Sequence, residues 1–421
     1  MRTYSEALNY LNQFINYERT QPQRYAPETL NLNRVNHLLD RLGRPDRAYR
    51  AIHIAGTKGK GSTAAMIESC LRAAGYRTGF YTSPHLHAFR ERMRINNEYV
   101  SREEFAQLVD ELEPHLNAVE GITWFEIVTT LAFLFFARSQ IDVAVLEVGL
   151  GGRFDATNVV TPIVSVITSL SMDHMNLLGN TIEQIAFEKA GIIKRHVPVV
   201  CAPQVPEALD VIRRVARMRG ARLILPPPQP SPVSPGRVLS LLGAHQVINA
   251  SVARTALQVA NENGLSVSDE ALRQGLETVK WPGRLEVLNR DPLVVVDGAH
   301  NGDSAQKLAA ALHEVFHVDQ WTLIIGISAD KDIPAILDGL LPIAKRLIVT
   351  QASNSRAANV ETIGAQVTDR GLAPTPTASV TEALEIALND RSPIIITGSL
   401  FTVADAREAW FARMGQPIEK D

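Results

Sequence analysis

Apolar runs of strand length alternate with segments of helical periodicity along most of the chain. The apolar runs are found at 50–55, 78–81, 142–148, 163–169, 197–202, 293–297, 322–326, 346–350 and 393–397. The main helical segments are found at 5–16, 28–42, 102–116, 125–138, 246–262, 268–277, 302–316, 333–344, 359–370 and 380–389. Strands that are apolar throughout and separated by helices are typical of a buried parallel sheet. The sequence therefore predicts an α/β fold.

The same pattern divides the chain into two parts. The alternation restarts after Trp281–Glu286, so we place a domain boundary there, with domains at 1–284 and 285–421. The proline-rich stretch 226–235 cannot form a helix or a central strand, and it is predicted as a surface loop or stiff connector within the first domain. Asn96-Asn97 predicts a small hairpin, because asparagine tolerates the left-handed backbone of such a turn.

Composition narrows the class of protein. The 421 residues include 45% hydrophobic and 21% charged side chains, which is typical of a soluble globular protein. With 42 basic and 45 acidic residues the formal charge is −3, so we expect no nucleic-acid or membrane partner. The longest apolar run, Ile127 to Ala137, is too short to span a bilayer, and we expect a cytoplasmic protein. Cys70 and Cys201 are predicted as core residues.

A glycine-rich loop follows the first strand. Its sequence, Gly56-Thr57-Lys58-Gly59-Lys60-Gly61-Ser62, leads into a helical pattern that begins at Ser62. Glycines let backbone N–H groups converge on an anion, and a helix N-terminus adds free donors. Lys60 would reach the outer phosphates of a nucleotide, although a glycine separates it from Ser62, unlike the usual G-x-x-x-x-G-K-[ST] spacing. The alternative is a turn that only joins strand to helix; we favour nucleoside triphosphate binding.

Two further strand ends carry candidate metal ligands. Glu147 ends a strand and is followed by Gly149-Leu150-Gly151-Gly152, and Asp173-His174 follows the next strand. Ligands of open parallel sheets gather at the carboxyl ends of strands, so Glu147 is a natural Mg²⁺ ligand. The alternative for Glu147 is a buried ion pair. Position alone leaves His174 open between a metal or phosphate role and a structural hydrogen bond, because Mg²⁺ prefers oxygen.

Three other positions are ambiguous from the residues alone. Lys189 lies late in a helix that opens with a capping-box pattern at Thr181, where a lysine ordinarily complements the helix dipole. Asn249 follows Gly243-Ala244-His245-Gln246, whose polar groups suit either a base or ribose contact or helix capping. Asp297-Gly298-Ala299-His300-Asn301 stands at a strand end in the second domain, in a loop that would face the cleft if the two domains oppose the carboxyl edges of their sheets.

Together these motifs resemble the folylpolyglutamate synthase and dihydrofolate synthase family, a branch of the Mur ligases. The resemblance covers nearly the whole chain. It is carried in the family's order by Gly56 to Ser62, Thr82-Ser83-Pro84-His85-Leu86, Glu147 through Asn158, Ser171-Met172-Asp173-His174, Phe187 to Ile192, Gly243 to Gln246 with Asn249, Pro282-Gly283-Arg284, and Asp297 to Asn301. Two departures are Asn97, where a glycine is common, and Phe401, where a tyrosine is usual.

The resemblance implies a Mur-ligase-like P-loop N-terminal domain, a smaller Rossmann-like C-terminal domain, and ATP bound between them. The residues it implies for ATP are Gly59, Lys60, Gly61, Ser62, Asn249, Arg284, Asp297 and His300. The Mg²⁺ ligands it implies are Ser83, Glu147 and His174. The pterin-site residues it implies are Thr123, Phe125, Glu126, Phe154, Asp155 and Ala156.

Catalytic roles follow from the same resemblance for Lys60, His174 and Lys189. Lys189 matches a lysine that the family carbamylates with CO₂, and the carbamate helps to hold a second Mg²⁺. This reverses the interpretation that position alone favours for Lys189, and it decides the open role of His174.

The implied activity is ATP-dependent addition of L-glutamate to a reduced folate, to dihydropteroate, or to both. Phosphoryl transfer from ATP turns the acid into an acyl phosphate, and the amine of glutamate then displaces phosphate. We expect small-molecule substrates and a monomer. The alternatives are another Mur-type amino-acid ligase with a non-folate acid, a P-loop kinase, and a nucleotide-binding switch without chemistry.

Overall fold

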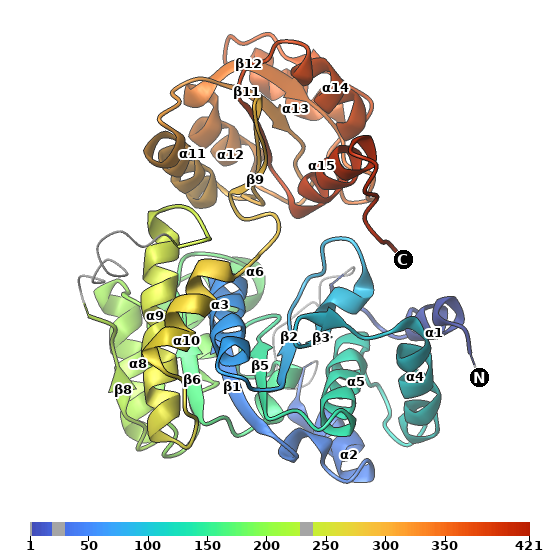
Figure 1. Cartoon of the computed structure of the whole chain (residues 1–421), viewed down its shortest axis with the longest axis vertical. Coiled ribbons are helices and arrows are strands. Elements are labelled where there is room, and N and C mark those ends of the chain that lie inside the picture. Colours follow the sequence, from blue (N-terminus) through green and yellow to red (C-terminus); the bar gives the residue numbers. More distant parts are fainter. Residues whose placement is uncertain (1, 19–29, 228–238) are drawn as a thin grey trace. The chain divides into compact units, whose positions relative to one another are not determined.

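The computed structural model describes residues 2–18, 30–227 and 239–421, which form two compact units (Figure 1). Unit 1 comprises Met1–His85, Phe89–Ser240 and His245–Val279, and unit 2 comprises Leu86–Ala88, Leu241–Ala244 and Lys280–Asp421. The main division therefore falls between Val279 and Lys280. Most of the predicted connector 226–235 lies outside the described residues.

Unit 1 is built on an eight-stranded sheet in the order β4-β3-β2-β5-β1-β6-β7-β8. Its strands are β1 (Arg50–Ala55), β2 (Thr78–Tyr81), β3 (Met93–Ile95), β4 (Glu98–Tyr99), β5 (Val143–Glu147), β6 (Val164–Ile167), β7 (Val199–Cys201) and β8 (Leu223–Ile224). All neighbours from β2 to β8 pair in parallel, while β3 and β4 add an antiparallel edge. The predicted hairpin is confirmed, since Asn96 and Asn97 adopt φ of 50° and 67° between β3 and β4.

Helices cover both faces of this sheet. They are α1 (Tyr4–Leu11), α2 (Leu32–Arg41), α3 (Lys60–Ala73), α4 (Arg102–Leu116), α5 (Trp124–Arg138), α6 (Met175–Leu178), α7 (Ile182–Ala190), α8 (Pro206–Met218), α9 (Ala244–Glu262) and α10 (Asp269–Thr278). Helices α1, α2, α4 and α5 share one core with alternate residues of the central strands, including Ala51, Ala144 and Leu146. Helix α3 packs on β1, β2 and β5, and α10 packs against α3 (Figure 1). The predicted helix at 5–16 is wrong at its end, because α1 stops at Leu11.

Unit 2 is built on a six-stranded sheet in the order β13-β12-β11-β14-β10-β9. Its strands are β9 (Glu286–Arg290), β10 (Leu293–Val296), β11 (Trp321–Ile325), β12 (Ala344–Val349), β13 (Thr375–Pro376) and β14 (Ile394–Thr397). All pairs are parallel except β9 with β10. The predicted α/β class with two largely parallel sheets is therefore confirmed.

The helices of unit 2 divide between the two faces of its sheet. They are α11 (Gly302–Phe316), α12 (Ile333–Leu340), α13 (Val360–Thr368), α14 (Val380–Leu388) and α15 (Leu400–Arg413). One face, with Val295, packs against α11, α12 and α13, and the other, with Val294 and Val296, packs against α14 and α15. The predicted helix at 333–344 ends early at Leu340, because Pro342 follows in a 3₁₀ turn.

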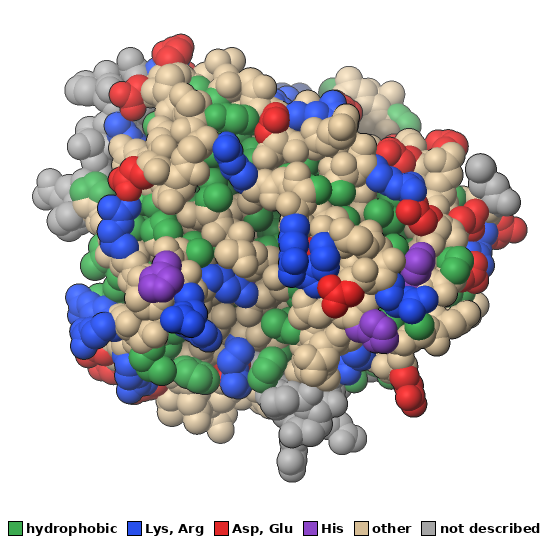
Figure 2. All heavy atoms as spheres, turned by 90° about the horizontal axis from the view of Figure 1, so that it is seen from below, with side chains coloured by type: hydrophobic (Ala, Val, Ile, Leu, Met, Phe, Trp, Pro, Cys, Tyr) green, Lys and Arg blue, Asp and Glu red, His purple; other side chains and the backbone are tan. Residues whose placement is uncertain are grey.

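Side chains of both charges reach the surface of the molecule. On the face shown in Figure 2, Lys, Arg, Asp and Glu side chains are scattered among apolar and uncharged groups. None of the helices in the described part of the chain combines the length and apolar character that a membrane crossing requires.

The topology of unit 1 brings distant segments together at one edge of its sheet. Strand β1 pairs in parallel with both β5 and β6, so Ile54 lies opposite Glu147 and Ala55 lies opposite Ile167. The carboxyl ends of parallel strands meet at the same edge. The glycine loop after β1, the Glu147 loop after β5 and the segment after β6 are therefore neighbours.

Candidate functional site

The glycine loop joins β1 directly to α3. The backbone N–H groups of Thr57 and Lys58 both donate to the carbonyl of Ser169, 3.0 Å away, which fixes the loop to the segment after β6. Gly59 takes the N-cap position with φ of 82° and has no side chain with which to cap the helix. Helix α3 begins at Lys60, two residues before the predicted start at Ser62. The first N–H groups of a helix have no acceptor within it, so this terminus can receive an anion.

Polar side chains of α9 lie against this loop. Gln246 Nε2 lies 3.4 Å from Ser62 Oγ, and Asn249 Nδ2 donates to Gln246 Oε1 at 2.9 Å. A Cβ atom at Gly59 would collide with the amide oxygen of Asn249. The structure therefore brings together Gly59, Ser62 and Asn249, which the resemblance had grouped. Gln246, from the same motif as Asn249, completes the contact.

Lys189 lies beneath the loop. Its side chain is only 5% exposed, and its Nζ donates to the carbonyl of Gly56 at 3.0 Å. Burial, together with the positive charge of Lys60, lowers the pKa of Lys189 to about 7, although Asp173 and Asp155 oppose the shift. A large fraction of this amine is therefore neutral at physiological pH, which makes it a nucleophile rather than a fixed cation.

Glu147 and Ser83 lie close together at the ends of neighbouring strands. The backbone N–H of Ser83 donates to Glu147 Oε2 at 3.3 Å, and Glu147 is 5% exposed. His174 is the N-cap of the short helix α6, with φ of 48° and a side chain 40% exposed beside Asp173. Within the residues that the structure describes, no three His, Cys, Asp or Glu side chains converge to hold a metal. Glu147 and Ser83 are the candidate ligands that it brings into contact.

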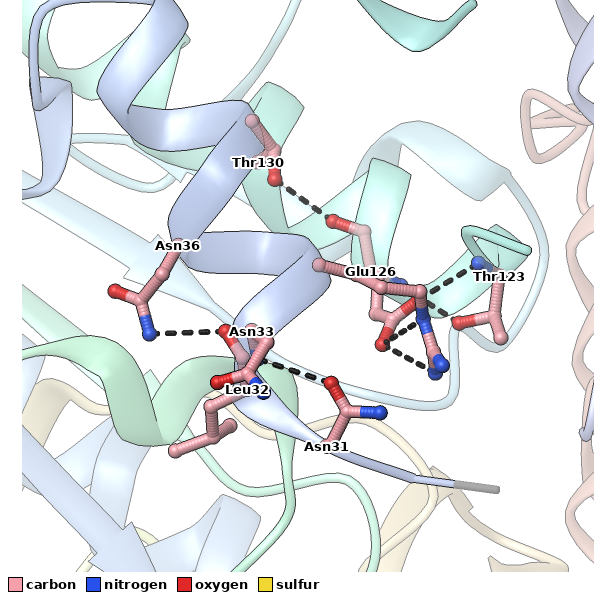
Figure 3. Close-up of polar contacts among 8 residues, drawn as sticks. Asn31, Leu32, Asn33, Asn36, Thr123, Glu126 and Thr130 are labelled. Atoms are coloured by element: carbon pink, nitrogen blue, oxygen red, sulfur yellow. Dashed lines mark hydrogen bonds and ion pairs between the residues drawn. The ribbon is translucent and has the colours of Figure 1, made fainter. Parts of the chain in front are cut away.

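The predicted substrate residues of α5 are engaged within the protein. Thr123 caps the helix, and the Glu126 carboxylate accepts from the backbone N–H of Thr123 at 2.7 Å (Figure 3). The same carboxylate pairs with Arg34 of α2 through Nε and a terminal nitrogen at 2.8 to 3.1 Å. Sequence reasoning missed Arg34, because its partner lies 92 residues away.

The remaining substrate candidates surround the loop after β5. Gly149 abuts the ring of Phe125, since a Cβ there would lie 2.6 Å from the ring Cζ. The Asp155 carboxylate accepts from the backbone N–H groups of Gly149 and Leu150, each at 3.0 Å, and Ala156 is buried. The Arg153 guanidinium stacks on the neighbouring Phe154 ring, 4.2 Å from its centroid. Among the substrate candidates around this loop, Phe125 and Phe154 are partly exposed, whereas Asp155 and Ala156 are buried.

The candidates of unit 2 lie at the carboxyl end of β10. The Asp297 carboxylate accepts from the backbone N–H groups of Leu285 at 2.8 Å and Ala299 at 2.9 Å. His300 Nδ1 lies 2.8 Å from the carbonyl of Gly298, and a Cβ at Gly298 would lie 2.5 Å from a guanidinium nitrogen of Arg284. Arg284, Asp297 and His300 therefore form one local group around Gly298.

Comparison with known proteins shows consistent similarity. Residues 54–204 match the Mur ligase middle domain, and residues 283–400 match the Mur ligase glutamate ligase domain. The chain is 38% identical to the dihydrofolate synthase/folylpolyglutamate synthase of Bacillus subtilis, over 90% of this chain and 94% of that protein. It is 35% identical to the folylpolyglutamate synthase of Lacticaseibacillus casei, over 96% of this chain and 98% of that protein.

A solved structure agrees with these sequence matches. The folylpolyglutamate synthase of Mycobacterium tuberculosis, complexed with ADP and AMPPCP, superposes with a TM-score of 0.86 at 31% identity. The alignment covers 97% of this chain and 98% of that one. The similarity therefore extends through both units.

Proposed function

The chain belongs to the folylpolyglutamate synthase and dihydrofolate synthase family of Mur ligases, and we propose that it uses ATP to join L-glutamate to a folate acid. The acid is a reduced folate, dihydropteroate, or both. The single observation that best supports this proposal is the glycine loop itself, which ends at a helix start without a side-chain cap and whose Gly56 carbonyl accepts from the buried amine of Lys189.

ATP binding is assigned first to the glycine loop. The residues proposed to hold the phosphates are Gly59, Lys60, Gly61 and Ser62, because the start of α3 offers backbone donors beside an ammonium group. Asn249 is proposed as a further nucleotide contact, since it touches the same loop. In unit 2, we assign nucleotide contacts to Arg284, Asp297 and His300, which share one loop environment.

Oxygen donors at the strand ends suit Mg²⁺. The buried carboxylate of Glu147 lies next to Ser83, whose hydroxyl supplies a second oxygen, and His174 is the third proposed ligand. When bound, this ion supplies positive charge that neutralises the phosphate oxygens. Glu147 keeps its orientation through the backbone N–H of Ser83.

The environment of Lys189 suits carbamylation. A neutral amine attacks CO₂, an N–C bond forms, and one proton is lost to solvent, leaving a carbamate with a negative charge. The pKa of about 7 makes the neutral amine available, and Lys60 nearby would stabilise the new negative charge. We propose that this carbamate provides oxygen ligands for a second Mg²⁺.

The reaction proceeds in two displacements. A carboxylate oxygen of the folate acid attacks the γ-phosphorus of ATP, the bond to the β-phosphate oxygen breaks, and ADP leaves. The amine of glutamate then attacks the acyl carbon, phosphate leaves, and the amine gives up its proton. Lys60 and the backbone donors of α3 stabilise charge on the transferring group, which is chiefly electrostatic catalysis by preorganised groups.

The acid substrate is assigned to the region around Phe125 and Phe154. Their rings are partly exposed beside the loop after β5 and provide an apolar surface for a pterin. Thr123 and Glu126 support the start of α5 rather than presenting free polar groups. Asp155 and Ala156 form the buried base of the adjoining loop.

The deciding experiment supplies ATP, Mg²⁺ and L-glutamate with either dihydropteroate or tetrahydrofolate, and reads the products by mass spectrometry. The expected result is the gain of one glutamyl unit with release of ADP and phosphate. Gain on dihydropteroate alone identifies a dihydrofolate synthase, and gain on tetrahydrofolate alone a folylpolyglutamate synthase. No gain on either acid by a folded sample contradicts the proposal. Nucleotide-linked muropeptides then test the alternative of another Mur-type ligase, and a phosphorylated product without amide formation would indicate a kinase.

A further inference from the structure

A buried chain of polar groups connects β1 to the loop after β5. The imidazole Nε2 of His53 lies 2.8 Å from Thr157 Oγ1, and this hydroxyl lies 2.5 Å from Asp155 Oδ1. The backbone N–H of Thr157 also donates to Oδ1 at 3.0 Å, while Gly149 and Leu150 donate to Oδ2. His53 and Thr157 are fully buried. Neither side chain has a role in the proposed reaction so far.

The hydrogen bonds to the Asp155 carboxylate determine which group donates and which accepts along His53, Thr157 and Asp155. If the Thr157 hydroxyl donates to Asp155, its oxygen must accept from His53, which then carries its proton on Nε2. His53 Nδ1, which has no hydrogen-bond partner among the described residues, is then a lone pair. The reverse order would place an orphaned N–H at Nδ1, which is the costlier arrangement in a buried site. Burial lowers the pKa of His53 to about 3, so the imidazole stays neutral.

The segment that Asp155 holds lies among the proposed functional groups. Gly149 follows Glu147 by two residues and touches the ring of Phe125. At its other end, Gly152 packs against the backbone carbonyls of Glu188 and Lys189, because a Cβ there would lie 3.0 to 3.1 Å from each oxygen. A displacement of this loop would therefore disturb a proposed metal ligand, a proposed substrate ring and the helix that carries Lys189.

We infer that His53 and Thr157 are positioning residues of the proposed ligase, acting through Asp155. The carboxylate that they orient fixes the backbone of Gly149 and Leu150, and through it the acid-substrate side of the site. Asp155 thus acts on the substrate through the loop, because its carboxylate accepts hydrogen bonds from Gly149, Leu150 and Thr157 of the protein itself. This inference rests on the proposed function for its kinetic consequence, but the proton arrangement can be measured independently.

The kinetic test compares two substitutions of one hydroxyl. Thr157→Val keeps the shape and removes the donor, and it is expected to lower kcat/KM for the acid substrate about 10- to 100-fold, because small misplacements of reacting groups are costly. The KM for ATP is expected to stay within about threefold, since the phosphate loop is held separately by Ser169. Thr157→Ser is expected to restore the rate. The matched control is Thr255→Val, which removes a buried hydroxyl bound to a backbone carbonyl of α9 at 2.8 Å.

A second variant separates positioning from stability. His53→Leu removes the donor and also the unpartnered Nδ1 atom. We expect a thermal midpoint equal to or above that of wild type, together with about a tenfold loss of kcat/KM. If His53 only supported the fold, its substitution would lower both the thermal midpoint and kcat/KM, or neither of them. Full activity in His53→Leu or in Thr157→Val would overturn the inference.

The tautomer of His53 is read by NMR on protein labelled with ¹⁵N-histidine, with His53→Leu providing the assignment. The expected signature is a neutral ring protonated at Nε2 that does not titrate between about pH 5 and 9. A ring protonated at Nδ1, or one that titrates in this range, contradicts the inference. Absence of glutamate addition by wild type would instead refute the proposed function, and the NMR result would still decide the proton arrangement.

Discussion

Two strand–loop–helix connections, one in each unit, begin alike and end differently. In unit 1, β1 leads into Gly59 and the start of α3, where no side chain caps the helix. In unit 2, β10 leads into Asn301 and the start of α11, where Asn301 and Ser304 exchange hydrogen bonds at 2.9 and 3.0 Å in a capping box. Side chains of the second terminus accept from the backbone N–H groups of Asn301 and Ser304, while no side chain caps the first. Similar sequence patterns at strand ends are thus expected to differ in their capacity to bind phosphate.

The largest expected effect of breaking this comparison is at Lys60. We expect Lys60→Ala to lower kcat/KM for ADP formation about 10³-fold, because it removes the ammonium at the terminus proposed to bind phosphate. The matched change in unit 2 is Lys307→Ala, which removes a lysine from the early part of α11, where it pairs with Asp303. It is expected to leave kcat/KM within about twofold. Equal effects of the two variants, both folded by circular dichroism, would contradict the assignment.

The next effect concerns Lys189, whose replacement is expected to lower activity but to raise stability at pH 7. Lys189→Met is expected to lower kcat/KM about 100-fold, because the proposed carbamate cannot form. The pKa of Lys189 is about 7 in the folded protein and 10.5 in its ordinary state, so the unfolded chain binds more protons between these values. Wild-type stability is therefore expected to rise as pH increases from about 7 to 10, by up to about 5 kcal/mol, and the penalty to be complete below pH 7.

Denaturant unfolding at pH 7 and pH 9 in CO₂-depleted buffer checks this prediction. Lys189→Met should be more stable than wild type at pH 7. The difference in the free energy of unfolding should be smaller at pH 9, because only the wild type gains stability as the pH rises. If the variant is less stable than wild type at pH 7, burial of the Lys189 amine does not destabilise the folded protein. Restoring bicarbonate should raise wild-type activity and leave the variant unchanged.

A smaller effect is expected from adding a methyl group to the glycine loop at Gly59. Gly59→Ala should raise the KM for ATP about tenfold, because the new Cβ meets Asn249 and φ of 82° is unfavourable for alanine. Gly75→Ala is the matched control, since Gly75 has φ of 88° but nothing within 4 Å of the added atom. It carries the same backbone strain without the collision. If both variants change the KM equally, contact with Asn249 does not matter.

The smallest effect is expected at the capped terminus of unit 2. Asn301→Ala removes the cap of α11 and should lower the free energy of unfolding by about 1 kcal/mol. Activity measured well below the melting temperature should stay within about twofold. A loss comparable with that of Lys60→Ala would show that the second connection also has a catalytic role.

Much of the fold could be predicted from the sequence because its strands are buried on both faces. Strand β5, for example, is apolar along most of its length and wholly buried. Helix α8 was missed although Ala208, Val211 and Ile212 follow helical spacing after a proline at its first position. Strand β9 was missed because it is an edge strand whose residues are only partly buried, so its sequence carries a weak apolar signal.

The site was predictable where it depends on strand ends and not where it depends on distant side-chain pairs. The meeting of the glycine loop with the Glu147 segment follows from the parallel pairing of β1 and β5. The pairing of Arg34 with Glu126 joins residues 92 apart, and the contact of His53 with Thr157 joins residues 104 apart. No local pattern indicates such partners, since they are chosen by tertiary packing.

The interleaved composition of unit 2 has a practical consequence for dissecting this protein. Leu86 and Leu242, from well upstream in the chain, pack against the two apolar cores of that unit. A fragment cloned from residue 280 onward would lack both side chains and expose the surfaces they cover. The segment from residue 280 onward is therefore a poor candidate for independent expression or for exchange between relatives as a separate domain.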